Sequence, residues 1–285
     1  MRCSVHAQNW SATFSSKDLY LIDKAAAMGF DGIEIPLVTS VVAELPITEA
    51  KRRLSACGIS PSFDTGLDAD QNISSENLQC RIKGMDHLKR CIDIIAEFGG
   101  DELGGVCYGA WGYFSGSAPT ASELDRSAEC LRTVAEYAEP MHIDLAIEPV
   151  SRFEGYLIPT AAAGLTYLDM VGMKNVGMHL DTFQMNIEEE SPPAAIRAAG
   201  NRLFHFHLCA SNRGIPGKDH IDWKGVFDAL RSVGYHRWPT LEAIGSDSGE
   251  AAAAAKAWRQ IAPPDEIASG GLDLMRRHLT LGAAG

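Results

Sequence analysis

Short apolar runs alternate along the whole chain with longer segments of mixed polarity. The runs predict eight β-strands, at residues 3–7, 32–36, 59–64, 103–108, 144–149, 176–181, 203–208 and 240–243. In the longer segments apolar residues recur every three or four positions, as at Leu78, Ile82 and Met85, which is typical of an amphipathic helix. Most of these segments end at a glycine, which favours the left-handed residue that closes a helix. The pattern therefore predicts strands and helices in alternation.

This alternation indicates the fold class. Eight strands that alternate with helices over about 250 residues are typical of a (β/α)8 barrel. A doubly wound sheet is the alternative, but no GxGxxG motif follows the first predicted strand, as a dinucleotide-binding fold usually requires. We therefore expect an α/β fold, a single TIM-barrel domain over residues 1–285 with the barrel itself at about 1–260.

The chain after the eighth predicted strand contains two further helical segments. An alanine-rich helix is predicted at residues 250–261, followed by a break at Pro263 and Pro264 and by a final helix that carries Leu272, Met275 and Leu279. We interpret these segments as the eighth barrel helix and a C-terminal helical extension, at about residues 261–285, that packs over one end of the barrel.

Composition and charge narrow the class of partner. Of 285 residues 46% are apolar and 22% are charged, and 37 acidic against 25 basic residues give a net charge of −12. A polyanion of this kind repels nucleic acid and anionic membrane surfaces, so we expect neither as a partner. No apolar run is long enough to span a membrane, and the segment MRCSVHAQNW lacks the pattern of a signal peptide. We therefore expect a cytoplasmic protein.

The seven cysteines are scattered along the chain without a CxxC pair, which argues against a disulfide framework or a thiolate zinc site.

Candidate chemistry lies at the ends of the last four predicted strands. Glu148, Asp181, His207 and Glu242 are separated by 33, 26 and 35 residues, each about one β/α unit. Because active sites of TIM barrels lie at the C-terminal ends of the strands, the four side chains are expected to converge. A single acid at a strand end is commonly a helix cap or a solvated loop residue, but four in register favour a metal site. Three carboxylates and one imidazole suit Mn²⁺, Co²⁺ or Mg²⁺ better than a structural zinc.

The other histidines are expected to play different parts. His179 and His205 each lie two residues before a candidate ligand, so they face the same side of the sheet one layer deeper, as hydrogen-bonded interior residues. His6 ends the first predicted strand, where lining the pocket and packing are equally plausible. The remaining histidines fall in predicted helices or loops and are expected at the surface: His87, His142, His220, His236 and His278.

Four segments carry a family resemblance. EPVSRFEGYLIPTAAAG, HLDTFQMNIEE, HFHLCASNRGIPGKDHIDW and LEAIG together resemble the ketose 3-epimerases, the D-tagatose/D-psicose 3-epimerase group of the xylose-isomerase-like barrels. The resemblance is dense between Glu148 and Glu242. It implies that Glu148, Asp181, His207 and Glu242 bind a divalent metal, most often Mn²⁺ or Co²⁺, and that Glu148 and Glu242 form the acid/base pair. It also implies a homodimer or homotetramer.

The resemblance extends to the residues around the substrate. It implies that Glu154 and Arg213 hold the hydroxyls and the carbonyl end of a sugar, and that Trp111 and His6 form part of the pocket wall. Two positions depart from the family pattern. Gln184 stands where the family usually has histidine, and glutamine cannot titrate near neutral pH. Cys209 and Ala210 stand where Gly-Glu is common, so one carboxylate is missing. Both changes leave the metal ligands intact and leave the identity of the sugar open.

The expected reaction follows from the chemistry of a ketose. A divalent ion that chelates the carbonyl and hydroxyl oxygens stabilises an enediolate. Inversion of a carbon requires bases on opposite faces of the substrate, and Glu148 and Glu242 come from strands on two sides of the barrel. We therefore expect a metal-dependent isomerase that epimerises C3 of a free ketose. Three alternatives with the same metal site stay open: an aldose–ketose isomerase, a hydroxypyruvate-type isomerase, and a lyase acting on a 3-keto sugar or glycoside.

Two other classes of protein are disfavoured. Abasic-site endonucleases share the barrel, but they need more metal ligands and a basic face for DNA. A non-catalytic binding or scaffold barrel would be indicated by loss of a ligand, and all four candidate ligands are present.

Overall fold

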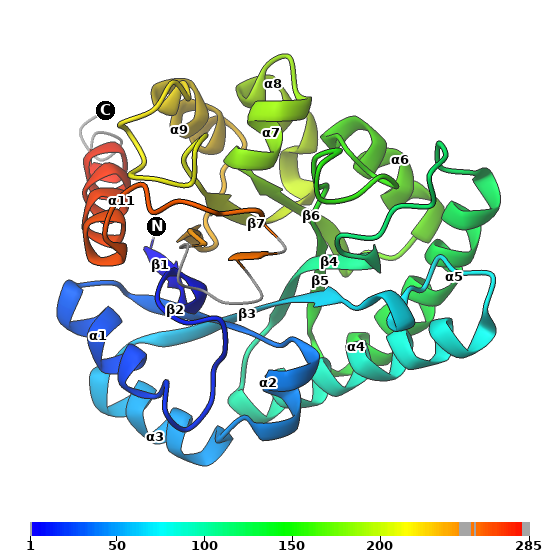
Figure 1. Ribbon diagram of the computed structural model, residues 1–285, viewed down its shortest axis with the longest axis horizontal. Coiled ribbons are helices and arrows are strands. Elements are labelled where there is room, and N and C mark those ends of the chain that lie inside the picture. Colours follow the sequence, from blue (N-terminus) through cyan, green and yellow to red (C-terminus); the bar gives the residue numbers. More distant parts are fainter. Residues whose placement is uncertain (1, 245–251, 254, 281–285) are drawn as a thin grey trace.

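The fold is a closed barrel of parallel strands surrounded by helices (Figure 1). The structure is a computed structural model, which describes residues 2–244, 252–253 and 255–280. Its eight strands are neighbours in chain order, and pairing of β1 with β8 closes the barrel. The strands are β1 (Ser4–His6), β2 (Gly32–Pro36), β3 (Ser60–Leu67), β4 (Glu102–Ala110), β5 (Asp144–Ile147), β6 (Val176–Asp181), β7 (Leu203–Leu208) and β8 (Pro239–Leu241). The expected α/β TIM barrel is confirmed.

The helices lie outside the strands and cover their outer faces (Figure 1). They are α1 (Tyr20–Met28), α2 (Thr39–Glu44), α3 (Ile47–Cys57), α4 (Leu78–Phe98), α5 (Ala121–Ala138), α6 (Ala161–Val171), α7 (Thr182–Glu188), α8 (Pro192–Ala199), α9 (Trp223–Ser232) and α11 (Pro264–Thr280). Two helices, α2 and α3, connect β2 to β3, and two more, α7 and α8, connect β6 to β7. The short α2 and α7 begin close to the C-terminal ends of their strands, where they add to the wall around the barrel mouth.

The strands alternate between an apolar outer face and a polar inner face. Ile33 and Ile35 of β2 belong to the hydrophobic core, while Glu34 between them contacts His205 and His207 of β7 across the barrel. Successive side chains of a strand point to opposite faces, so the apolar residues meet the helices and the polar ones fill the barrel. The interior is therefore built from charged and imidazole groups that need partners.

Two glycines of β4 leave room for this interior. A Cβ atom on Gly104 would lie 3.3 Å from Nδ1 of His179, and one on Gly105 would lie 2.1 Å from the carbonyl oxygen of Thr65. Gly105 also has φ of +105°, a conformation that side-chain-bearing residues rarely adopt. Its carbonyl oxygen accepts a hydrogen bond from the backbone N–H of Glu148, at 3.0 Å. The backbone of Gly105 therefore fixes the point at which Glu148 leaves the sheet.

Replacement of Gly105 by alanine is expected to lower the free energy of unfolding by about 3 kcal/mol or more, because both the positive φ and the close carbonyl oppose a Cβ atom. Gly99→Ala is the matched control. Gly99 also has a positive φ, +77°, but nothing lies within 4 Å of its added Cβ, so a loss of about 1 kcal/mol is expected. Urea unfolding of both variants measures the difference, and equal losses would contradict the steric argument.

The C-terminal part of the chain differs from the prediction. Helix α11 packs against β8 and α9, and Nη2 of Arg276 donates a hydrogen bond to the carbonyl oxygen of Gly29, at the end of α1. It therefore lies in the ring between α9 and α1 (Figure 1), and the expected extension over one end of the barrel is wrong. The physical reason is that the apolar residues Leu272 and Met275 are buried on a helix that packs on β8, where Gly271 lets it approach Leu241 closely.

The alanine-rich helix expected at 250–261 is also wrong over residues 255–261, which form a turn at Ala255 and Lys256 and then irregular chain. Lys256 has φ of +55°, which is incompatible with a continued helix. Residues 250, 251 and 254 and the side chain of Leu279 lie outside the described part of the chain.

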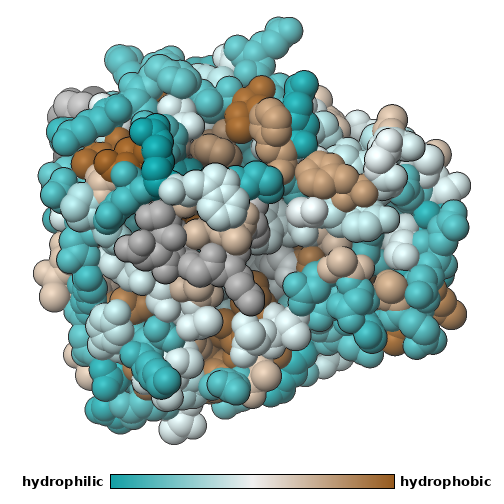
Figure 2. All heavy atoms as spheres, viewed as in Figure 1, coloured by the Kyte–Doolittle hydropathy of each residue, from teal (hydrophilic) through white to brown (hydrophobic). Residues whose placement is uncertain are grey.

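Within the described residues, no helix combines the length and the apolar character that crossing a membrane requires. Figure 2 shows hydrophilic residues over most of the rim of the face in Figure 1, with hydrophobic ones in several small separate areas.

All seven cysteines are free thiols, and five of them are buried, as expected for small apolar residues: Cys3, Cys91, Cys107, Cys130 and Cys209.

Candidate active site

The four candidate ligands lie at the C-terminal ends of β5 to β8. Glu148 and Glu242 directly follow β5 and β8, Asp181 is the last residue of β6, and His207 is the next to last of β7. The backbone N–H of Glu242 donates to the carbonyl oxygen of Leu208 at 3.0 Å, so the sheet ladder continues to the residue itself. Nδ1 of His207 lies 3.6 Å from Oε1 of Glu242. The structure therefore brings together the side chains that the strand spacing predicts to converge.

Because these carboxylates are buried close together, the ionisation of Asp181 and Glu148 is unfavourable. Burial and the charge of Glu242 raise the pKa of Asp181 to about 8, and burial followed by the charge of Glu242 raises the pKa of Glu148 well above its usual value. Burial also opposes ionisation of Glu242, but the nearby imidazole of His207 and the charge of Arg213 lower its pKa to about 2. Neighbouring carboxylates in a buried site disfavour each other's ionisation. A cation among them would relieve this repulsion.

Two buried atoms of the group also fit a cation. Oδ2 of Asp181 and Nδ1 of His207 form no hydrogen bond with any described residue, although both side chains are almost inaccessible. Buried polar atoms are normally satisfied, so such a pair calls for a ligand. An oxygen-rich donor set with one imidazole is typical of sites for Mn²⁺, Co²⁺ or Mg²⁺. The residues present therefore fit a divalent metal ion.

The residues expected around the substrate form one hydrogen-bonded network beside this group. Nη2 of Arg213 donates to Oε1 of Glu154 at 2.6 Å, and Nη1 donates to Oε2 of Glu242 at 3.2 Å. Oε2 of Glu154 accepts hydrogen bonds from Nε1 of Trp111 at 3.1 Å and from Nε2 of Gln184 at 2.9 Å. Arg213 therefore joins the predicted substrate residues to the predicted acid/base pair.

Gln184 is held at both ends of its amide. Its Oε1 accepts the backbone N–H of Ser151 at 2.8 Å, while its Nε2 donates to Glu154. These two bonds fix which end of the amide faces the site. At this position the chain therefore presents a neutral, oriented N–H donor that does not titrate.

An open cleft leads to Arg213. It has a volume of about 270 Å³ and is lined by Trp10, Phe183, Arg213, Ile244 and residues 255–262. The guanidinium of Arg213 stacks 4.0 Å above the ring of Phe183. The irregular segment after β8 therefore forms one wall of the approach to the site.

His6 lies inside the barrel next to His207. Its Nε2 is 2.9 Å from Oδ1 of Asp64, its Nδ1 accepts the backbone N–H of Gln8 at 3.1 Å, and its ring centre is 5.9 Å from that of His207. Both ring nitrogens are thus satisfied by the protein. His6 therefore contributes to the barrel interior next to the site.

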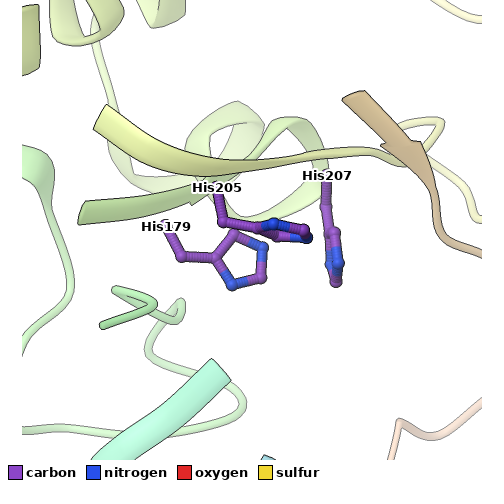
Figure 3. Close-up of side chains that lie close together, drawn as sticks. All are labelled: His179, His205 and His207. Atoms are coloured by element: carbon purple, nitrogen blue, oxygen red, sulfur yellow. The ribbon is translucent and has the colours of Figure 1, made fainter. Parts of the chain in front are cut away.

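Three imidazole rings pack edge to face beside the ends of β6 and β7 (Figure 3). His205 and His207 project from the same strand, β7, and His179 projects from β6, with its ring centre 4.6 Å from that of His205 and 4.1 Å from that of His207. The expectation of a hydrogen-bonded interior residue is confirmed for His205, which bonds to Glu34 and Glu102. It is wrong for His179, whose ring nitrogens bond to none of the described residues; its Nδ1 lies 4.0 Å from Oε2 of Glu148.

The sequence interpretation missed several residues near the site. Glu34 and Glu102 bond to the interior histidines, and Asp64 bonds to His6. Glu34 is a lone acid in the apolar run GIEIP, and this was the only signal in the sequence. The thiol of Cys209 was also missed: its sulfur and carboxylate oxygens of Asp181 and Glu242 all lie within 4.8 Å of one another.

The surface histidines were predicted with one clear error. His142, His220 and His236 are exposed, as expected, and His278 is half-buried with its ring stacked on Phe227. The prediction is wrong for His87, which is buried and lies 3.0 Å from Oγ1 of Thr65. Its position on α4 faces β3, so the helix presents this ring to the sheet.

Comparison with known proteins places this site in a family. A family model described as xylose isomerase-like TIM barrel matches residues 22–278. A probable ketose 3-epimerase from Synechocystis sp. is 33% identical over 97% of this chain and 96% of its own length. A D-psicose 3-epimerase from Ruminiclostridium cellulolyticum is 33% identical over 92% of this chain and 90% of its own. The crystal structure of a D-allulose 3-epimerase from Methylomonas sp. in complex with D-allulose has a TM-score of 0.93 and 29% identity, covering 98% of this chain and 97% of that chain.

These matches span nearly the whole chain, including β5 to β8 and the residues at their ends. They confirm the resemblance that the segments between Glu148 and Glu242 carry. The chain therefore belongs to the xylose isomerase-like TIM barrel family and, within it, to the ketose 3-epimerases, which are isomerases.

Proposed function

We propose that this protein inverts C3 of a free ketose with the help of a divalent metal ion, preferably Mn²⁺, held by Glu148, Asp181, His207 and Glu242. The observation that carries the proposal is the convergence of these four side chains at the ends of adjacent strands, with Oδ2 of Asp181 and Nδ1 of His207 lacking any bond to a described residue. Co²⁺ and Mg²⁺ are the alternative ions, since they accept the same donor atoms.

The reaction requires proton transfer on two faces of one carbon. When bound, the metal ion polarises the carbonyl of the ketose and stabilises the negative charge of the enediolate that forms on the substrate. Glu148 and Glu242 leave the barrel from β5 and β8, so a sugar between them meets one carboxyl group on each side. One carboxylate removes the C3 proton, and the other carboxyl group delivers a proton to the opposite face. In the reverse direction the two residues exchange roles.

The network around Glu154 is proposed to orient the sugar. Both oxygens of Glu154 already accept hydrogen bonds, from Arg213, Trp111 and Gln184, so this carboxylate fixes the donors around it. Arg213 is then directed towards the carbonyl end of the substrate, and Gln184 offers its remaining N–H to a hydroxyl oxygen. Trp111 and His6 contribute to the walls, and burial of the network limits the access of water.

The proposal is tested by following hydrogen exchange in D₂O. Protein stripped of metal and reloaded with Mn²⁺ is incubated with fructose, psicose, tagatose, ribulose and xylulose, and each sugar is analysed by proton NMR. Deuterium at C3 together with the C3 epimer is the expected result. Deuterium at C1 with appearance of an aldose would instead indicate an aldose–ketose isomerase. Absence of exchange in every free ketose would overturn the free-sugar assignment in favour of 3-keto glycosides or short keto acids.

Arg213 is the residue of this network with the largest expected effect. Replacement by lysine is expected to lower kcat/KM by about 100-fold, because a compact ammonium group lacks the fixed planar donors with which the guanidinium bonds to both Glu154 and Glu242. Arg152→Lys is the matched control. Arg152 also forms a bidentate ion pair, with Glu188, but the side chain of Arg152 is exposed. Steady-state kinetics on the best ketose measure both variants, and equal small effects would contradict the role of Arg213.

A further inference from the structure

A buried carboxylate lies directly beneath the proposed metal site. Glu34, in the middle of β2, is completely inaccessible to solvent. Its Oε2 is 3.2 Å from Nε2 of His207 and 3.2 Å from Nε2 of His205. Burial of an ionised carboxylate is costly unless hydrogen bonds compensate it, and an apolar residue would fill the same volume without this cost. The placement of Glu34 therefore points to a task that involves the two rings.

The contact with Glu34 determines which nitrogen of His207 carries hydrogen. An ionised carboxylate only accepts hydrogen bonds, so the ring nitrogen that faces it, Nε2, is the donor. The opposite nitrogen, Nδ1, lies 3.6 Å from Oε1 of Glu242 and bonds to no described residue. In the neutral ring Nδ1 then has a free lone pair on the side of the carboxylates. Imidazoles that bind metals are typically fixed in this way by a second carboxylate.

Glu34 also stands at one end of a series of bonded side chains whose charges alternate in sign. Nδ1 of His205 lies 2.6 Å from Oε1 of Glu102, so both nitrogens of His205 face carboxylates. Arg237 in turn bonds to Glu102 and to Asp144. The series runs from the metal end of the barrel to the N-terminal ends of β4 and β5. Because it places a cation next to each acid, it keeps Glu34 in the ionised form that accepts a hydrogen bond.

We infer that Glu34 is a positioning residue for the metal centre: it accepts the Nε2 hydrogen of His207, fixes the plane of that ring, and so presents Nδ1 to the metal. This inference rests on the proposed metal site. Glu34 does not itself bind the ion, since its nearest partners are the two ring nitrogens on the side away from the other ligands.

The test is the affinity of the protein for Mn²⁺ after Glu34→Gln. Glutamine keeps the size of the side chain, but it removes the negative charge that strengthens the bond to the N–H of His207, and its amide nitrogen can only donate. The dissociation constant, measured from the electron paramagnetic resonance signal of free Mn²⁺, is expected to rise by about 10- to 100-fold. Glu102→Gln is the control: it removes a half-buried carboxylate of the same series that touches His205 but not His207, and a much smaller rise is expected.

A second measurement reports on the ring itself. In wild-type protein with histidine labelled by ¹⁵N and loaded with Mg²⁺, long-range proton–nitrogen NMR is expected to place hydrogen on Nε2 of His207 and none on Nδ1. Hydrogen on Nδ1, or equal Mn²⁺ affinity of wild type and Glu34→Gln, would overturn the inference while leaving the proposed function intact. Failure of the wild-type protein to bind either ion would overturn the proposed metal site and this role with it.

Discussion

Epimerisation by Glu148→Gln and by Glu242→Gln is expected to fall by about 1,000-fold or more, because each variant lacks the proton carrier on one face of C3. The two variants should differ in the exchange that remains. A variant that keeps one functional carboxylate can still remove and return the C3 proton of the epimer that presents it on that side. Residual C3 deuteration in D₂O is therefore expected in one epimer for Glu148→Gln and in the other epimer for Glu242→Gln.

Metal binding has to be separated from proton transfer in this experiment, since both residues are also proposed ligands. Bound Mn²⁺ is measured in each variant, and exchange is assayed at saturating Mn²⁺. Glu97→Gln, on the exposed side of α4, is the control for a charge change distant from the site and should retain full activity. Full C3 exchange in both epimers by both active-site variants would show that neither carboxyl group carries the proton.

The barrel was predictable because its strands are marked twice, by apolar runs and by the glycines that end the helices between them. The bounds of β2, β6 and β7 coincide with the predicted runs 32–36, 176–181 and 203–208. Strand ends locate the mouth of a barrel, so Glu148, Asp181, His207 and Glu242 could be placed together without a structure. The last helix was misplaced because its apolar stripe fits the side of a barrel as well as an end, and only packing on β8 decides between them.

The buried contacts that hold the interior histidines in place could not be predicted in the same way. Glu34 contacts His205 and His207, which lie 171 and 173 residues further along the chain, and Arg237 contacts Glu102 across 135 residues. Such pairs depend on which side chains face inward on strands on opposite sides of the barrel, and on the tilt of those strands. A lone acid in an apolar run indicates that a partner exists but does not identify it. His87 was misassigned for the same reason, since its partner Thr65 lies on β3.

The affinity for Mn²⁺ is expected to increase with pH up to about 8. Burial and the charge of Glu242 raise the pKa of Asp181 to about 8 in the metal-free protein, against 3.8 for an unperturbed aspartate. Below pH 8 a proton on Asp181 competes with the metal, and the raised pKa of Glu148 makes a second proton compete, so the dissociation constant should fall by at least about ten-fold per pH unit up to that value. Titrations with Mn²⁺ between pH 6 and pH 9 measure this slope.

The same proton sets how the stability of the metal-free protein depends on pH. A folded-state pKa above the unfolded value means that the folded protein binds the proton more tightly. The stability it contributes is therefore complete below pH 3.8 and is lost as the pH rises through about 8. Mn²⁺ at 100 times its dissociation constant should then stabilise the fold by about 2.7 kcal/mol. Asp181→Asn should make the rise in affinity with pH less steep, because one competing proton is gone and the proton on Glu148 remains. A wild-type affinity that is constant from pH 6 to pH 8 would show that Asp181 is already ionised without metal, and that the buried carboxylates are stabilised by Arg213 and the interior histidines instead.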